Sequence, residues 1–336
     1  MSDLGPPEQT ADIVDEAPVR EEIAPVAAVA PREPRVRRLN LIGMRNIFFA
    51  ISLLIIIPGI ISMATRGFLL GIDFAGGTEF TVAFASHPSL AEVQSKVDGE
   101  NLNGSVISTG SGGFIIRYPP LTTQQQASVI SDLEGKLGKA DVTQILEVGP
   151  TIAGETIEFA LLAVLAASVA ILFLLAIRFR NVPGGWRAGF QFGGSALFAL
   201  LHDVFLLTGV FSILGKVIGL RIGEIDSLFV TAVLTVVGFS VHDTIVVFDR
   251  IRENLRVSQR LSFEQIVNLS IMQTAARSII TSFTVVLVLA SIFIAGGTTL
   301  RGFALALLIG IVSGTYSSIF NAAPLLVVWR RLQPLR

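Results

Sequence analysis

Six long apolar runs constrain the fold of this chain more than any other feature of its sequence. A helix needs about 20 predominantly apolar residues to cross the roughly 30 Å hydrocarbon core of a bilayer. The runs cover residues 47–63, 157–177, 188–214, 227–248, 278–296 and 302–329, and the first helix is predicted over 46–65. The composition agrees, because 51% of the residues are hydrophobic and only 15% are charged. The chain is therefore predicted to be a polytopic α-helical membrane protein with six transmembrane helices.

Composition also excludes several kinds of functional site. A formal net charge of -1 gives no basic face for nucleic acid, and the absence of cysteine excludes disulfides and thiolate metal sites. Three histidines without ligand-like spacing make no metal site. We expect no cofactor and no enzymatic activity, so function must depend on carboxylates, arginines and helix packing.

Arginines predict the orientation of the helices. They cluster before the first run, between the second and third, between the fourth and fifth, and after the sixth. Under the positive-inside rule these four segments are cytoplasmic, which agrees with six alternating helices. Residues 1–38 are rich in proline and acids and are predicted to be a disordered cytoplasmic tail, and residues 330–336 a cytoplasmic end.

The hydrophilic interval 66–152 is then an extracytoplasmic domain that precedes a five-helix membrane domain over 153–329. Strands are predicted over 80–84, 105–109, 114–118 and 142–148, and helices over 89–98 and 122–137. The order βαββαβ indicates an α+β, ferredoxin-like domain between helices 1 and 2. Nothing in this interval has the pattern of a catalytic site.

An acid lies inside the fourth apolar run. A charged side chain at membrane depth costs roughly 2.5 to 3.5 kcal/mol on insertion scales and usually marks an ion or substrate path, so Asp243 predicts proton coupling. Arg277 enters the fifth run from the same side of the membrane and is a candidate partner. Its helix is predicted to begin earlier, because Ser262 and Gln265 have the spacing of a capping box. The two charges are expected at similar depth.

A second pair of polar residues lies in the third run. Asp203 follows His202 there, and the two either extend a proton relay or form hydrogen bonds between neighbouring helices.

The segment after the first helix reads GIDFAGGTEF, over residues 71–80. Gly71, Gly76 and Gly77 permit positive φ and close backbone approach, with Asp73 and Thr78 between and after them. The preferred interpretation is a structural elbow in which Asp73 caps backbone amides. A direct part in transport is the alternative.

Three separated motifs carry a family resemblance. The GIDFAGGTEF segment, GFSVHDTIVVFDRIREN at 238–254 and QTAARSIITS at 273–282 resemble the SecF family, accessory subunits of the bacterial Sec translocon within the resistance-nodulation-division superfamily. The resemblance covers about residue 41 to the end of the chain. It implies that Asp243 and Arg277 take part in proton passage. His242 stands where the family is expected to carry asparagine, and it either joins the relay or is a packing residue.

The resemblance also implies a function, partners and a location. The expected function is proton-driven promotion of late preprotein translocation and release on the outer side. The expected partners are SecD, the SecYEG channel, YajC and the translocating preprotein, and the expected location is the cell inner membrane. A small-solute or lipid efflux transporter of the same superfamily and a non-transporting translocon scaffold are the alternatives.

Overall fold

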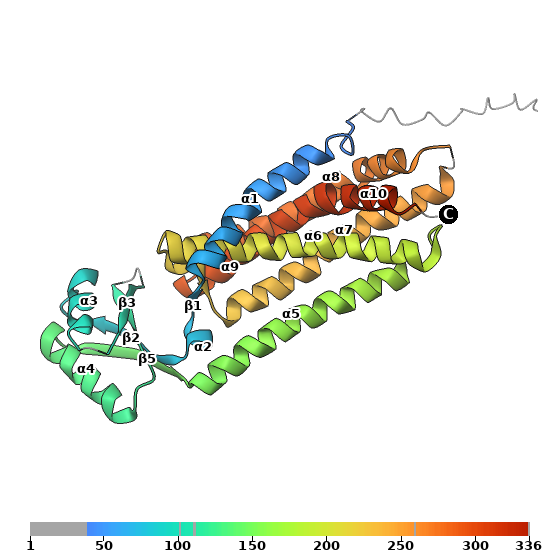
Figure 1. Cartoon of the computed structure of the whole chain (residues 1–336). Coiled ribbons are helices and arrows are strands. Elements are labelled where there is room, and N and C mark those ends of the chain that lie inside the picture. Colours follow the sequence, from blue (N-terminus) through green and yellow to red (C-terminus); the bar gives the residue numbers. More distant parts are fainter. Residues whose placement is uncertain (1–38, 101, 110–111, 259, 335–336) are drawn as a thin grey trace, which may run out of the picture. The chain divides into compact units, whose positions relative to one another are not determined.

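The computed structural model describes residues 39–100, 102–109, 112–258 and 260–334 (Figure 1). The predicted tail over residues 1–38 and the last two residues lie outside these ranges. Two parts differ in secondary structure: an α+β domain and a bundle of long helices.

Within the described residues, six helices are long and apolar enough to cross a membrane, which agrees with the predicted number. They are α1 (Arg45–Arg66), α5 (Pro150–Arg178), α6 (Gly185–Ser212), α7 (Ser227–Val257), α8 (Phe263–Ala295) and α9 (Thr298–Ser317), which continues into α10 (Ala323–Leu332). Most extend beyond their apolar runs. α8 begins 15 residues before its run because Ser262 and Gln265 form the predicted capping box at its start.

π-Helical turns occur in two of the membrane-spanning segments. A π-helical turn, Ile213–Val217, continues α6, and a second, Ser318–Ala322, joins α9 to α10. π-Helical turns interrupt the regular hydrogen-bond ladder and often lie at functional sites. In contrast, α7 is a regular α-helix over all its 31 residues.

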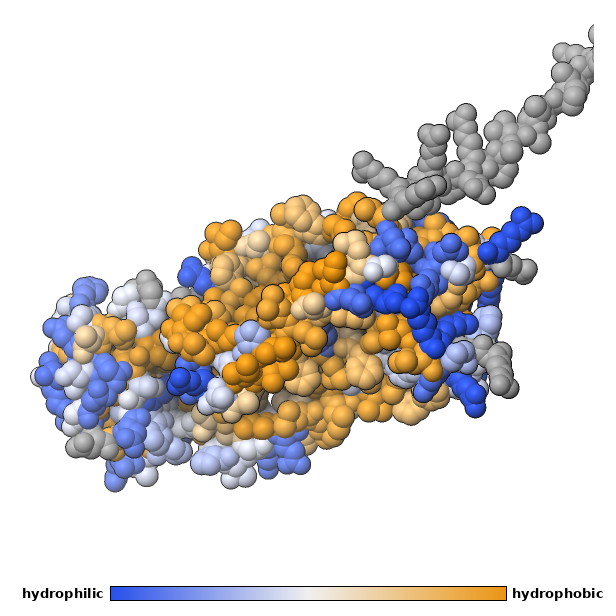
Figure 2. All heavy atoms as spheres, turned by 45° about the horizontal axis from the view of Figure 1, so that its top comes forward, coloured by the Kyte–Doolittle hydropathy of each residue, from blue (hydrophilic) through white to orange (hydrophobic). Residues whose placement is uncertain are grey.

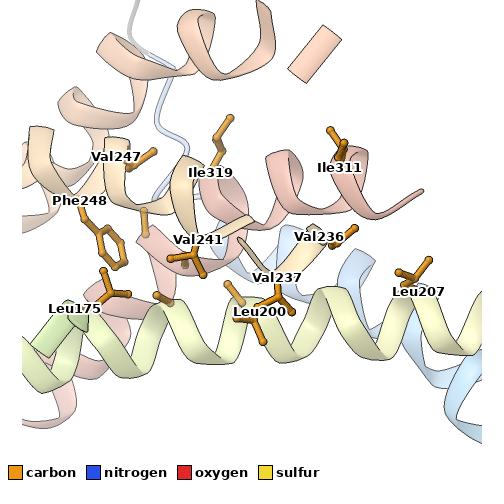
Figure 3. Packing of buried hydrophobic residues seen from close by; sticks show 14 of the residues in the cluster. Leu175, Leu200, Leu207, Val236, Val237, Val241, Val247, Phe248, Ile311 and Ile319 are labelled. Carbon is orange, nitrogen blue, oxygen red and sulfur yellow. The ribbon is translucent and has the colours of Figure 1, made fainter. Parts of the chain in front are cut away.

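The helices pack through buried apolar side chains, among them Leu175 on α5, Leu200 on α6, and Val237 and Phe248 on α7 (Figure 3). Two glycines allow the backbones of α1 and α6 to approach each other closely. A Cβ atom at Gly59 would lie 2.8 Å from the Cα of Gly209, so both positions need glycine. Seen from one side, apolar residues cover the middle of the bundle and hydrophilic residues lie at both ends (Figure 2). This distribution suits a lipid environment.

The α+β domain follows α1. Its elements are β2 (Gly77–Phe84), α3 (Leu90–Asp98), β3 (Ser105–Ser108), β4 (Gly113–Tyr118), α4 (Thr123–Leu137) and β5 (Ala140–Val148), in the predicted order βαββαβ. The sheet is antiparallel with strand order β3-β4-β2-β5. Buried residues of the strands and both helices, including Phe80, Val93, Ile116 and Leu133, form its own core.

A second, two-stranded sheet joins the two parts and was not predicted. β1 (Leu69–Leu70) follows α1 and pairs in parallel with β6 (Glu224–Ile225), which precedes α7. Asp226 comes next and is the N-cap of α7, since its carboxylate accepts a hydrogen bond of 2.8 Å from the amide of Phe229. Burial raises the pKa of the Asp226 carboxyl, and the negative charges of Glu224 and Asp73 act in the same direction.

Replacing Gly59 with alanine tests the contact between α1 and α6. The new methyl group would overlap the backbone at Gly209, so we expect Gly59→Ala to lower the stability of the folded chain by about 1 to 3 kcal/mol. Gly154→Ala on α5 is the matched control, because no atom lies within 4 Å of its Cβ position. Thermal unfolding in mild detergent measures both, and equal melting temperatures for the two variants would contradict the packing described.

Replacing Asp226 with asparagine tests the electrostatics at the start of α7. A carboxyl with a raised pKa binds its proton more tightly in the folded state, so wild-type stability falls as pH rises through that pKa. Asparagine caps helices about as well and carries no charge. We expect Asp226→Asn to gain stability relative to wild type between acidic and neutral pH, by about 1 kcal/mol at most. Melting curves across this range measure the difference, and a relative loss would contradict the assignment.

Candidate functional site

Asp243 lies on α7, on the side that faces α8 and α9, and is 2% exposed. The hydroxyl of Ser282 on α8 donates to its Oδ2 at 3.3 Å, and that of Thr315 on α9 donates to the same oxygen at 3.4 Å. Thr315 has a single hydroxyl proton, for which Ser282 Oγ at 2.5 Å and the carbonyl of Ile311 at 2.9 Å compete with Asp243. The acid therefore faces the protein interior, with two long hydrogen bonds to its carboxylate.

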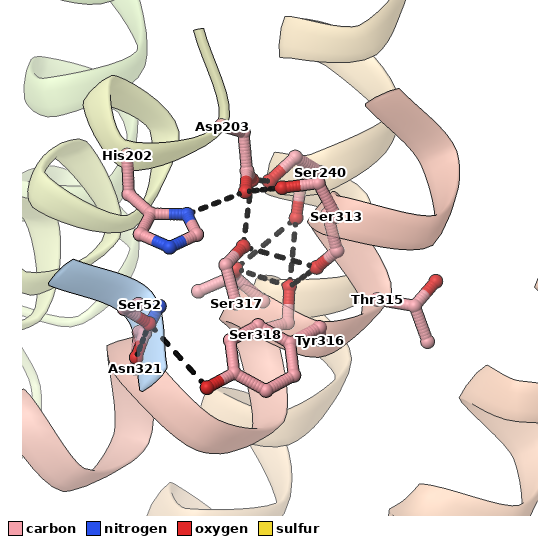
Figure 4. Close-up of polar contacts among 12 residues, drawn as sticks. Ser52, His202, Asp203, Ser240, Ser313, Thr315, Tyr316, Ser317, Ser318 and Asn321 are labelled. Carbon is pink, nitrogen blue, oxygen red and sulfur yellow. Dashed lines mark hydrogen bonds and ion pairs between the residues drawn. The ribbon is translucent and has the colours of Figure 1, made fainter. Parts of the chain in front are cut away.

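Asp203 on α6 is the centre of a denser polar cluster and is 1% exposed (Figure 4). Hydroxyl groups of three serines donate to its carboxylate: Ser240 on α7 at 2.7 Å, and Ser313 and Ser317 on α9 at 2.6 Å each. Nδ1 of His202 lies 3.0 Å from Oδ1. Four polar groups from three helices thus surround one carboxylate.

The two acids differ in how well their charge is compensated. Hydrogen bonds to the charged form offset the loss of hydration that burial causes. Asp203 has three hydroxyl donors at 2.7 Å or less, whereas Asp243 has two at 3.3 Å and 3.4 Å. The negative charge of Asp243 is therefore the less stabilised of the two. This geometry favours hydrogen bonding between helices as the role of Asp203 and proton exchange at Asp243.

Two helices connect the acids. On α7, Ser240 and Asp243 are three residues apart, so they lie on neighbouring positions of one face. On α9, Ser313 and Ser317 face Asp203, while Thr315 points away from that cluster (Figure 4) and donates to Asp243. Residues of α7 and α9 therefore surround both acids.

Arg277 does not contact Asp243. It is exposed, and among the described residues it forms no ion pair with that acid. Its position on α8 explains the separation. Arg277 precedes Ser282, the residue that reaches Asp243, by five residues, or about 7.5 Å along the axis, and positions five apart do not share a face. Along α8, Arg277 is thus separated by more than one helical turn from the residue that reaches Asp243.

Arg277 instead lines a cleft of about 800 Å³ at the end of the bundle away from the α+β domain. Charged residues dominate its lining, including Arg178, Asp249, Arg250, Arg252, Glu253 and Arg256. Asp249 pairs with Arg178 at 3.0 Å and Arg250 with Glu253 at 2.6 Å. Arg277 therefore lies in a basic cleft in this arrangement of the helices.

His242 precedes Asp243 in the sequence, but the two side chains point in different directions from α7. The side chain of His242 is exposed, whereas Asp243 is buried, because successive helical residues point about 100° apart. Within the described ranges no hydrogen bond joins the two. No group of three His, Asp or Glu side chains in these ranges could hold a metal ion.

The glycine-rich motif after α1 forms the junction between the two parts. Asp73 lies in the short helix α2 (Ile72–Ala75), and its Oδ2 accepts a hydrogen bond of 2.9 Å from the amide of Ser227, the first residue of α7. This is amide capping, as the elbow interpretation predicts, but on a helix 154 residues away. The amide of Gly71 donates to the carbonyl of Ile225 at 2.8 Å.

The rest of the motif shapes the entry into the sheet. Gly76 and Gly77 have φ angles of +68° and +125°, which side chains disfavour, and a Cβ at Gly77 would overlap the carbonyl of Tyr118. Thr78 is fully buried, and its hydroxyl accepts a hydrogen bond of 3.1 Å from the amide of Leu121. These contacts are structural in character.

Arg117 on β4 was not identified from the sequence. Its guanidinium contacts Glu79 on β2 at 2.5 Å and Glu224 on β6 at 2.6 Å. Burial alone would lower the pKa of Arg117, but the hydrogen bonds and charges of the two glutamates outweigh burial and raise that pKa. No local pattern links these residues, because Arg117 and Glu224 are 107 positions apart.

Comparison with known proteins agrees with the motifs. Residues 129–332 match the C-terminal region of the protein export membrane protein SecD/SecF family, and residues 61–86 match the SecD/SecF GG motif. A crystal structure of SecDF, a translocon-associated membrane protein from Thermus thermophilus, is similar with a TM-score of 0.76 and 32% identity. The similarity covers 88% of this chain and 39% of that chain.

Two curated relatives are similar over almost their whole length. The protein translocase subunit SecF of Thermobaculum terrenum is 43% identical over 311 residues, covering 89% of this chain and 96% of the relative. SecF of Anaerolinea thermophila is 42% identical over 296 residues, covering 87% and 94%. The extent of these matches and the family motifs place the chain in the SecF family of protein translocase subunits.

Proposed function

We propose that the chain is an auxiliary subunit of the Sec translocase that uses the proton motive force to promote late steps of preprotein translocation. Similarity to SecF subunits supports the translocase role. The observation that carries the proton coupling is the burial of Asp243 among three helices with two long hydrogen bonds. A carboxylate in such surroundings is stabilised by taking up a proton or by the approach of a cation.

Proton exchange at Asp243 would change how α7, α8 and α9 pack. The charged form attracts the hydroxyls of Ser282 and Thr315, and protonation weakens that attraction. One proton crossing the membrane makes roughly 2.3 kcal/mol available per 100 mV. An equilibrium between two conformations that differ by a few kcal/mol can be shifted by that amount.

Arg277 is the residue that we propose promotes release of the proton from Asp243. In the arrangement described here it lies in the basic cleft, away from Asp243. A shift of α8 along its axis by about one turn and a rotation would bring the guanidinium toward the acid, stabilise the charged form and release the proton. Of the other residues predicted for the proton pathway, His242 is exposed, and Asp203 holds α6, α7 and α9 together through its serines.

SecD is the proposed partner. The similar SecDF chain is much longer than this chain, which covers 39% of it. The helices also leave large apolar side chains exposed, such as Phe283 and Leu287 on α8, where lipid or a second subunit would cover them. SecYEG, YajC and the preprotein are further proposed partners, on the basis of the family.

The proposed location is the inner membrane with both chain ends in the cytoplasm. The basic cleft lies at the end of the bundle opposite the α+β domain and collects arginines of three helices. This asymmetry follows the positive-inside rule, which would put the α+β domain outside.

The substitution Asp243→Asn tests the proposal. Asparagine keeps the size of the side chain and its ability to accept hydrogen bonds but cannot exchange a proton. We expect gradient-dependent export to fall to the level of vesicles without the chain, in inverted vesicles that contain SecD and equal amounts of each variant. Asp249→Asn on the same helix is the matched control, since Asp249 lies in the cleft and pairs with Arg178.

If Asp243→Asn supports gradient-dependent export as well as the wild-type chain does, the proton-coupled role is wrong. A non-transporting scaffold would then be the remaining translocase role. Equal losses from Asp243→Asn and Asp249→Asn would also contradict a specific role for Asp243.

The substitution Arg277→Ala tests the cation separately. Because Arg277 is exposed, we expect the folded amount of protein and its melting temperature to stay unchanged while gradient-dependent export is lost. Arg256→Ala, another arginine of the same cleft, serves as the control for general loss of positive charge. Normal export by Arg277→Ala would remove this residue from the cycle.

A further inference from the structure

Arg117 forms an ionic connection between the α+β domain and the helix bundle. It lies on β4, in the interior of the sheet, and is held there by Glu79 on the adjacent strand β2 at 2.5 Å. Its other contact, at 2.6 Å, is Glu224 on β6, which belongs to the segment between α6 and α7. The three side chains are 10% to 16% exposed, so water screens this pair of contacts only partly.

Glu224 is directly linked to the start of α7. Two residues later, Asp226 caps the helix, and Asp73 of the glycine-rich motif holds the amide of Ser227. Of the ion pairs within the described ranges, Arg117 to Glu224 is the one that crosses from the α+β domain to the bundle. Arg117 therefore connects the sheet to the end of one particular helix.

That helix is also the one that carries Asp243. Asp243 lies 17 residues beyond the N-cap, about 25 Å along the axis. α7 is regular over this length, whereas α6 and the α9–α10 helix contain π-helical turns. Without such an interruption, a shift or rotation near Asp243 moves the capped end of α7 as part of one rigid element.

We infer that Arg117 is a positioning residue that transmits movement of α7 to the α+β domain. The inference rests on the proposed function, because it assigns the route between proton exchange at Asp243 and action on the preprotein. The chain connections from α1 into β1 and from β5 into α5 attach the domain to the bundle, but neither includes α7. The pair of Arg117 and Glu224 supplies an ionic connection from the sheet to the segment before α7, in addition to the hydrogen bond between Asp73 and the amide of Ser227.

The absence of native cysteine permits a direct test. The double variant Arg117→Cys with Glu224→Cys removes the ion pair and provides two thiols that a reducible bifunctional reagent can join across the length of the lost arginine. Proton uptake by vesicles and gradient-dependent export are measured on the same preparation, which contains SecD. Before cross-linking, we expect proton uptake to persist and gradient-dependent export to fall about fivefold or more, as loss of a typical coupling free energy would cause.

After cross-linking, we expect export to recover, and to fall again when the link is reduced. A purely structural role for Arg117 would not produce this reversible recovery. Arg221→Gln is the matched control: Arg221 also pairs with Glu224, at 3.5 Å, but lies in the same segment, so its loss breaks no connection to the sheet. Glu224→Gln, which keeps an oxygen for Arg117, should give a smaller loss and provides a second variant if the double variant folds poorly.

Two results would overturn the inference. One is normal gradient-dependent export by the double variant before cross-linking and by Glu224→Gln. The other is a loss of export that the completed cross-link does not reverse. An Asp243→Asn sample in the same experiment distinguishes failure of this inference from failure of the proposed function. If Asp243→Asn abolishes gradient-dependent export, the proposed proton coupling is retained and only the route through Arg117 is rejected.

Discussion

A carboxylate that is removed from water and only weakly compensated is the constraint on which this structure depends. Asp243 is almost fully buried, yet its partners are two hydroxyls at the long end of the hydrogen-bond range. Buried charges are normally paired or neutralised. A change in the charge of Asp243 would therefore favour a different packing of the helices around it. A fully paired acid would not have this effect.

Asp203 illustrates the contrast within the same bundle. Three short hydrogen bonds from serines on α7 and α9 stabilise its carboxylate, and they join three helices at one point. A buried carboxylate that accepts several hydrogen bonds from neighbouring helices makes packing specific. Because Ser240 and Asp243 share α7, the Asp203 cluster and Asp243 lie along one helix. The same helix begins at the junction where Asp73, Asp226 and the Arg117–Glu224 pair meet.

Much of the fold could be predicted because it follows from local patterns. Six helices are evident from apolar length, the start of α8 from the spacing of Ser262 and Gln265, and the order of the α+β elements from alternation and turns. The burial of Asp243 follows from its place in an apolar run. The position of Arg277 could not be predicted, since it depends on how α8 is shifted and rotated against α7, which apolar length does not determine. The β1–β6 pair and the Arg117–Glu224 contact join residues more than a hundred positions apart, without any local signal.

Infrared difference spectroscopy of isotope-labelled aspartate tests the central claim most directly. The chain is reconstituted with SecD, and spectra are compared with the proton gradient imposed and dissipated. The account predicts that the gradient changes the carboxylic-acid carbonyl band of Asp243, assigned by its loss in Asp243→Asn, while Asp203 keeps its carboxylate bands. An Asp243 carboxyl whose protonation is the same under both conditions would contradict the account.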